Sequence, residues 1–206
     1  MHDTRSFESS AQALVRVGQQ AFAQGWVPAT SGNFSCRLDD ETVAITVSGK
    51  HKGFLTLDDI MLVDYSGRSL DGKRPSAETL LHLHLYRREP KIGAVLHTHS
   101  ISSTVLSRAA ADHLVLDGLE VLKAFDGIDS HESQLTVPVF ANDQDIARMA
   151  SMVDDYMDKH PPIAGYLIAG HGLYTWGRSV NDTLRHLEAF EFLFQCELEF
   201  RRIKAS

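Results

Sequence analysis

The sequence predicts one α/β domain in which helices cover a mixed sheet. The chain has 206 residues, 43% of them hydrophobic and 23% charged, which is typical of a soluble globular protein with a substantial core. Short apolar runs of strand length alternate with longer segments in which apolar residues recur at helical spacing. Because no repeat, low-complexity tract or linker interrupts this order, we expect residues 1–206 to form a single domain.

The first half of the chain predicts two helices separated by short strands. Ser6 can cap the first helix, and Gly25 is well placed to end it. A short turn or helix is expected over 56–59, and a second helix, with Ser76 as its N-cap, over 79–88. Strands are expected over residues 34–38, 43–47 and 61–65.

The second half of the chain predicts three more helices and further strands. Helical spacing covers 101–111, 146–157 and 180–203, and runs of strand length cover 113–116, 136–140 and 163–169. Pro138 predicts an edge position for its strand, because proline cannot donate to the ladder. Asn142 and Ser179 are placed to cap the last two helices. The final helix is too apolar for one buried face, so part of it is expected to pack on another subunit.

Charge and cysteine content narrow the class of partner. A net charge of −7 argues against nucleic acid or an anionic membrane, although a local nest of backbone N–H groups can still bind phosphate. Cys36 and Cys196 are far apart and form no CxxC pattern, which fits a reducing cytosol. The N-terminus has no apolar signal region, and no stretch approaches 18 apolar residues. We therefore expect a cytoplasmic protein that acts on a small molecule.

The apolar run 92–96 ends in His97 and His99, the first candidates for a metal site. Side chains two apart in a strand point to the same side, so both imidazoles would project together, as zinc and neighbouring transition metals require. The alternative is a pair of histidines capping a strand. His82 and His84 have the same spacing on a helix, where residues two apart diverge by about 200°. They cannot share a metal and are expected on the helix surface or at an interface.

Two glycine-centred turns are candidates for a phosphate site. One lies in the segment 30–35, which contains Asn33, and the other in 48–53, which begins with Ser48 and Gly49. Both place small polar side chains beside exposed backbone N–H groups, and such nests bind phosphate. Ordinary hairpin turns have the same composition. The two turns bracket one hairpin, which favours a shared role.

A third histidine and a carboxylate would complete a catalytic centre. His171 lies between two glycines directly after the strand 163–169, so it is the best candidate for a third ligand. Three histidines would leave a zinc ion an open position, where it would act as a Lewis acid on a substrate carbonyl or hydroxyl. A carboxylate nearby could then move protons. Glu78 is one acidic residue in the sequence, but the helix dipole alone explains a carboxylate at its position. Together these features predict a zinc lyase that acts on a small phosphorylated keto-sugar through an enediolate.

Five motifs in this order resemble the class II aldolase/adducin-head family along nearly the whole chain. They are Ser-Gly-Asn33, Thr46-Val-Ser48-Gly49, Arg-Pro-Ser76-Ala-Glu78, His97-Thr-His99-Ser100 and Gly170-His171-Gly172. The resemblance implies a three-layer α/β/α domain around a largely antiparallel sheet, and usually a four-fold tetramer with active sites between subunits. It also implies one zinc per subunit, held by His97, His99 and His171. The residues it assigns to the substrate phosphate are Asn33, Ser48, Gly49 and Ser76.

Within this family the chain most resembles a dehydratase branch of methionine salvage, whose substrate is a methylthio-substituted ribulose 1-phosphate. The resemblance is carried by Tyr174 and Trp176 and by the aromatic run 190–194. It implies that Glu120 is the acid/base and that Lys123 binds substrate, while Glu78 lies near the metal. The nearest alternative is a sugar-phosphate aldolase or 4-epimerase that uses Glu78 as its base. Adducin-like binding modules are a further alternative, which the three histidines disfavour.

Overall fold

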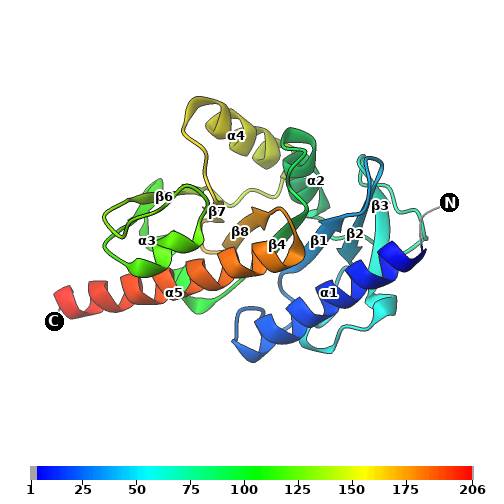
Figure 1. Ribbon diagram of the computed structural model, residues 1–206, viewed down its shortest axis with the longest axis horizontal. Coiled ribbons are helices and arrows are strands. Elements are labelled where there is room, and N and C mark those ends of the chain that lie inside the picture. The colour runs from blue at the N-terminus through cyan, green and yellow to red at the C-terminus, as the bar shows by residue number, and fades with distance from the viewer. Residues whose placement is uncertain (1–3, 206) are drawn as a thin grey trace.

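The computed structural model describes residues 4–205 and contains an eight-stranded sheet with helices on both faces (Figure 1). The strand order is β3-β2-β1-β4-β8-β7-β6-β5, and every neighbouring pair is antiparallel except β6 and β7. The strands are β1 (Asn33–Arg37), β2 (Thr42–Thr46), β3 (Ile60–Asp64), β4 (Ala94–Thr98), β5 (His113–Leu116), β6 (Leu135–Phe140), β7 (Gly165–Ile168) and β8 (Gly172–Gly177). The expected largely antiparallel sheet is confirmed.

The helices divide between the two faces of this sheet. The α-helices are α1 (Thr4–Ala23), α2 (Thr79–Arg88), α3 (Ile101–Ala109), α4 (Ile146–Lys159) and α5 (Val180–Ala205). Three short 3-10 helices are η1 (Lys52–Phe54), η2 (Leu57–Asp59) and η3 (Glu120–Ala124). Side chains of α1, α3 and α5 share one hydrophobic core, and those of α2 and α4 share a second core on the other face. The three-layer α/β/α architecture is therefore confirmed.

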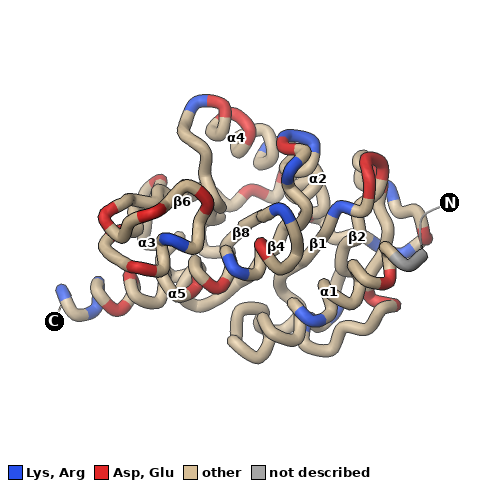
Figure 2. Tube along the Cα trace, viewed as in Figure 1, with Lys and Arg blue, Asp and Glu red and all other residues tan. Residues whose placement is uncertain are grey.

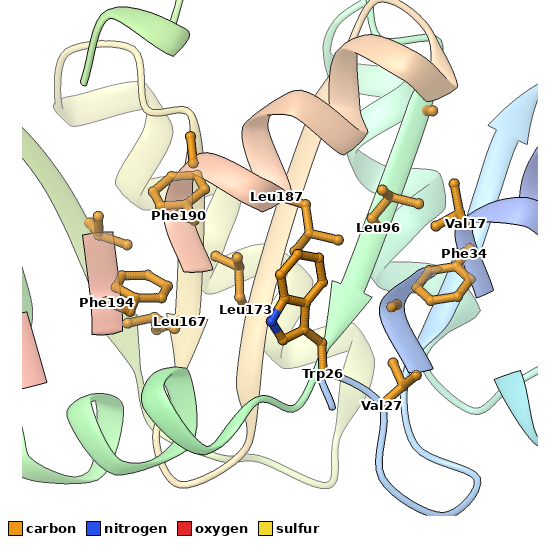
Figure 3. Close-up of a cluster of buried hydrophobic side chains, with 14 of the residues drawn as sticks. Val17, Trp26, Val27, Phe34, Leu96, Leu167, Leu173, Leu187, Phe190 and Phe194 are labelled. Carbon is orange, nitrogen blue, oxygen red and sulfur yellow. The ribbon is translucent and has the colours of Figure 1, made fainter. Parts of the chain in front are cut away.

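Aromatic residues of α5 anchor the first core. Phe190 and Phe194 are fully buried and lie over Leu167 of β7 and Leu173 of β8 (Figure 3). Burying an aromatic side chain contributes about 1.5–3 kcal/mol, so this helix is a major source of stability. Large apolar side chains also face outward from α5 and from α3; they are Phe192, Phe200, Ile203, Ile101 and Val105.

The position of Pro138 differs from the expected edge strand. β6 lies second from the edge, between β5 and β7. Pro138 is opposite His113 of β5, whereas β7 pairs only with Val139 and Phe140. The ladder on the β7 side therefore begins after the proline, which explains why its missing N–H is tolerated inside the sheet.

Two predicted helix starts in the first half of the chain are wrong. Ser6 lies inside α1, which is described from Thr4. The N-cap of α2 is Glu78, without a capping side-chain hydrogen bond, while Ser76 Oγ accepts the Glu78 N–H at 3.3 Å. Ser76 thus holds the turn that precedes the helix, and this turn brings Glu78 to the end of the sheet.

One predicted cap in the second half is wrong and the other is confirmed. Asp145, not Asn142, caps α4, because its side chain accepts the Arg148 N–H at 3.0 Å. Ser179 Oγ accepts the Asp182 N–H at 3.1 Å, as expected for the start of α5.

Most charged residues lie around the periphery of the fold. The central strands β4 and β8 contain none, α4 and α5 carry both signs, and α2 carries only the two arginines at its C-terminal end (Figure 2). Within residues 4–205, no helix is long and apolar enough to cross a membrane. A site for an anion therefore has to consist of a few neighbouring side chains and backbone N–H groups.

Candidate metal centre and substrate cavity

The three predicted histidines come together beside the carboxyl end of β4. His97 is the fourth residue of that strand, His99 follows its end, and His171 lies in the turn between β7 and β8. The Nε2 atom of His97 is 2.8 Å from Nε2 of His99 and 3.2 Å from Nε2 of His171. One ligand atom from each residue lies within 4.8 Å of the others. The predicted cluster is therefore formed within one chain.

The tautomer of His97 is fixed by the neighbouring strand. Its Nδ1–H donates to the carbonyl oxygen of Leu173 at 2.9 Å, so its Nε2 lone pair faces the other two histidines. The ring of Tyr174 stacks on that of His97, with centroids 4.0 Å apart. Because His97 lies opposite Tyr174 in the β4–β8 ladder, the sheet itself sets this orientation.

The turn that holds His171 depends on Gly172. A Cβ atom on Gly172 would lie 1.9 Å from the carbonyl oxygen of Thr98, which no other residue could accommodate without moving β4. This agrees with the close backbone approach predicted for the glycine-flanked histidine. Thr104 Oγ1 also donates to the carbonyl oxygen of His171 at 3.1 Å, which fixes the turn against α3.

The cluster has the donor properties that zinc prefers. Burial lowers the pKa of His97 well below its ordinary value and that of His99 to about 4, and neighbouring histidines act in the same direction. Both imidazoles are therefore neutral at pH 7 and have lone pairs to donate. Three imidazole nitrogens converging on one point fit a zinc ion or a neighbouring transition metal.

Glu78 lies against the histidine cluster. Its Oε1 is 3.0 Å from Nε2 of His171, and its Oε2 is 3.5 Å from Nε2 of His97. Asn33 Nδ2 donates to Oε2 at 2.7 Å. Burial raises the pKa of Glu78, but the two histidines and the hydrogen bond from Asn33 outweigh it and bring the pKa well below the usual range. Glu78 is thus a carboxylate held at the centre.

A cavity of about 290 Å³ opens on this centre. Its lining includes all four residues expected to bind phosphate, namely Asn33, Ser48, Gly49 and Ser76, together with Glu78 and His99. Gly49 has a φ of 75°, the left-handed conformation in which glycine is favoured. A larger hollow of about 880 Å³ lies elsewhere and has none of the predicted site residues in its lining.

Lys52 is a cation in the cavity that the sequence reasoning missed. It is 2% exposed, and among the described lining residues it is the only lysine or arginine. Its Nζ donates to the carbonyl oxygens of Thr30 at 3.0 Å and of Lys50 at 2.6 Å. Burial lowers its pKa to about 8, partly offset by Glu78. In the sequence, Lys50 and Lys52 look equivalent, and only the fold distinguishes the exposed lysine from the buried one.

Glu120 and Lys123 lie outside this cavity. They pair with each other at 2.6 Å in η3, and Glu120 is also 3.2 Å from Nδ1 of His131. The Glu120 side chain is 68% exposed, and neither residue belongs to the cavity lining. Within one chain, therefore, the two carboxylates singled out in the sequence are in different places, and only Glu78 contacts the histidines.

Comparison with known proteins identifies the family. Residues 12–198 match the model of the class II aldolase and adducin N-terminal domain. The chain belongs to this family. A protein from Methylococcus capsulatus named methylthioribulose-1-phosphate dehydratase is 55% identical over 204 residues, or 99% of this chain and 100% of that protein. One of the same name from Pseudomonas syringae pv. tomato is 56% identical over 200 residues, covering 96% of this chain and 98% of that protein.

Solved structures of class II aldolases have the same fold. An L-fuculose-1-phosphate aldolase from Thermus thermophilus superposes with a TM-score of 0.77 at 27% identity, covering 97% of this chain and 99% of that one. A sugar-phosphate aldolase from Thermotoga maritima gives a TM-score of 0.66 at 16% identity, covering 95% and 96%. The expected class II aldolase-like fold is therefore confirmed.

In this class II aldolase family chain, the helix histidines are not where the sequence placed them. His82 and His84 were expected on the surface or at an interface, yet they are 0% and 3% exposed. The reason is that α2 packs between the sheet and α4, so His82 faces Ser35 of β1 while His84 contacts Asp154 of α4. A signal was available for His82, because it follows Glu78 by four residues and so shares its helix face.

Proposed function

We propose that this chain is a zinc-dependent methylthioribulose-1-phosphate dehydratase of methionine salvage, located in the cytoplasm. It would convert 5-methylthioribulose 1-phosphate to 2,3-diketo-5-methylthiopentyl 1-phosphate and water. The observation that carries the proposal is the three-histidine centre in a chain about 55% identical, over nearly its full length, to proteins of that name. The free state of Cys36 and Cys196 agrees with a reducing compartment.

The histidines His97, His99 and His171 would hold one zinc ion per subunit. Once bound there, zinc would supply a Lewis acid for the substrate's carbonyl. The chain's own contribution is to fix the donors: Leu173 sets the tautomer of His97, and Gly172 lets the His171 turn approach β4. Three protein ligands leave space for substrate, which is the pattern of catalytic rather than structural sites.

The cavity beside the histidines would receive the substrate's phosphate. Asn33, Ser48, Gly49 and Ser76 supply small polar groups and backbone N–H donors there. Lys52 adds the positive charge. An ammonium group has three N–H donors, two of which bond to the carbonyls of Thr30 and Lys50, so the third is available to a phosphate oxygen.

The proton transfer is assigned to Glu120, supplied by a neighbouring subunit of a tetramer. Glu120 lies outside the cavity of its own chain, so it can act only if a second copy brings it to the histidines. The exposed apolar side chains of α3 and α5 give such copies a surface on which to pack. Glu120 would take the C3 proton and help the C4 hydroxyl leave as water, with Lys123 beside it contacting the substrate. Glu78 would lie beside the metal and contact the histidines or the substrate without transferring the proton.

A second function is favoured by a specific contact. Glu78, and not Glu120, touches His97 and His171 within one chain. A carboxylate in that position could itself serve as the base of an aldolase or 4-epimerase, and the structurally similar Thermus thermophilus protein is named an aldolase.

Product analysis separates the candidates. The purified protein is incubated with 5-methylthioribulose 1-phosphate, and the diketone is followed by its absorbance. A dehydratase gives the diketone and one water per substrate. Cleavage between C3 and C4 would instead release dihydroxyacetone phosphate and methylthioacetaldehyde, and epimerisation would change only the configuration at C4. Either of these products without diketone would overturn the dehydratase proposal.

Removing the charge of Lys52 should weaken substrate binding. We expect Lys52→Met to raise KM roughly 10- to 100-fold, because a hydrogen bond to a charged group contributes about 1.5–3 kcal/mol. Steady-state kinetics measures this change. Lys50→Met is the matched control, since Lys50 is half exposed and pairs with Asp59 at 2.8 Å. An unchanged KM in a folded Lys52→Met protein would contradict the role of Lys52.

The same lysine predicts the alkaline limb of the pH profile. Burial lowers the pKa of Lys52 to about 8, so the ammonium is present below that pH and is lost above it. The KM of the wild-type protein should therefore rise above about pH 8, whereas the KM of Lys52→Met should not rise from this cause. Parallel pH profiles of the two proteins between pH 7 and 9.5 provide the measurement, and identical profiles would contradict the assignment.

A further inference from the structure

A chain of buried polar side chains runs from the active-site cavity into the core beneath α2. Its members are Asn33, His82, Ser35 and Tyr86, all of them no more than 4% exposed. Asn33 and Ser35 are on β1, and His82 and Tyr86 are on α2. Only Asn33 among them lines the cavity. The phosphate-binding role proposed for the cavity lining therefore does not explain why His82, Ser35 and Tyr86 are buried polar residues.

Each hydrogen bond in this chain has a defined direction. The Glu78 carboxylate only accepts, so Asn33 must turn its amide nitrogen toward Oε2, 2.7 Å away. The amide oxygen of Asn33 then faces Nε2 of His82, which must donate to it. Nδ1 of His82 is left as an acceptor for the hydroxyl of Ser35 at 2.7 Å. Ser35 Oγ in turn accepts from the hydroxyl of Tyr86 at 2.8 Å.

Helix α2 and the sheet fix the positions of the residues in this hydrogen-bond network. Glu78 and His82 are four residues apart, at the start of α2 and one turn further on, so they lie on one face. Asn33 lies opposite His97 in the β1–β4 ladder. Burial lowers the pKa of His82 to about 3, so the imidazole stays neutral and keeps one donor and one acceptor.

We propose that His82 is a positioning residue of the active site: through its Nε2–H it fixes the amide of Asn33, so that the amide nitrogen faces Glu78 and the cavity. Without this donor the buried amide oxygen of Asn33 would have no partner from His82, and the amide would lose one of the two hydrogen bonds that fix its plane. The activity readout of this inference rests on the proposed dehydratase function, but the hydrogen-bond direction does not.

The direction of the hydrogen bond from His82 to Asn33 is tested first, in protein without substrate or metal. Nitrogen-15 NMR of imidazole-labelled wild-type protein distinguishes the two neutral tautomers, and the signals of His82 are those missing in His82→Gln. We expect the Nε2–H tautomer at pH 7. The Nδ1–H tautomer or a protonated ring would overturn the proposal even if the dehydratase assignment is correct.

The effect on the site is tested by a double-mutant cycle. We expect His82→Leu and Asn33→Ala each to lower kcat/KM by roughly tenfold or more, and the double variant to be no worse than Asn33→Ala alone. His82→Gln, whose amide can donate to Asn33 and accept from Ser35, should recover most of the loss. His84→Leu is the matched control, because it removes a buried histidine from the same helix that contacts Asp154 rather than Asn33.

Additive losses would show that His82 does not act through Asn33, and wild-type turnover in His82→Leu would show that it does not act on the site at all. Either result overturns the proposal. If His82→Leu does not fold, Ser35→Ala is used in the same cycle, since it removes only the hydroxyl that donates to Nδ1 of His82. Additivity between Ser35→Ala and Asn33→Ala would be equally contradictory.

Discussion

Replacing Glu120 with glutamine should lower kcat by roughly 100- to 10,000-fold, the usual contribution of a positioned general acid/base. Glutamine keeps the size of the side chain but can neither take the C3 proton nor deliver one to the leaving hydroxyl. Because Glu120 is exposed in its own chain and paired only with Lys123 and His131, the substitution should leave folding and zinc content unchanged. Diketone formation under saturating substrate measures the loss.

Two further variants make this result specific. Glu132→Gln changes another glutamate close to Glu120 in sequence and should retain wild-type turnover. Glu78→Gln should also impair the enzyme, since it removes the carboxylate beside His97 and His171. Near-normal turnover in Glu120→Gln, together with an inactive Glu78→Gln, would assign the proton transfer to Glu78. It would contradict the proposal that Glu120 of a neighbouring subunit carries it out.

Replacing a histidine of the centre should remove both metal and activity. We expect His99→Ala to lose bound zinc and to lower turnover by about 1,000-fold or more, because the metal supplies several kcal/mol of charge stabilisation. Zinc per chain by elemental analysis and turnover are measured on the same preparation. His113→Ala is the control, since His113 is half exposed and contacts Asp112. One zinc per chain and full turnover in His99→Ala would exclude the three-histidine site.

The sequence predicts most of the strands and helices because their patterns are local, although it does not predict the central strand β8. The strand before His97 follows from an uninterrupted apolar run, and the helix over 79–88 follows from the start and stop signals around it. Caps are less predictable, since several side chains near a helix start can bond to its N–H groups. Asp145 caps α4 in place of Asn142 for this reason: its side chain accepts the Arg148 N–H, and the helix itself begins at residue 146 as expected.

The site residues that could be predicted are those placed by residue spacing or by a motif that resembles the family. His97 and His99 follow from strand geometry, and His171 from its flanking glycines. Lys52 could not be placed, and for His82 the sequence offers only the helix face that it shares with Glu78, because both roles depend on burial between elements far apart in the sequence. For Lys52, the deciding neighbour is the carbonyl of Thr30, and for His82 it is Asn33 on a strand across the fold. Glu120 poses a different difficulty, since the fold of one chain leaves it outside the cavity that opens on the histidines.

The most direct test of the central claim is a zinc titration of the chelator-treated protein. Turnover of 5-methylthioribulose 1-phosphate is followed through the diketone while zinc is added in known amounts. Turnover should be absent at first, rise in proportion to added zinc and level off at one zinc per chain. Full turnover in protein shown by elemental analysis to contain no metal would contradict the account.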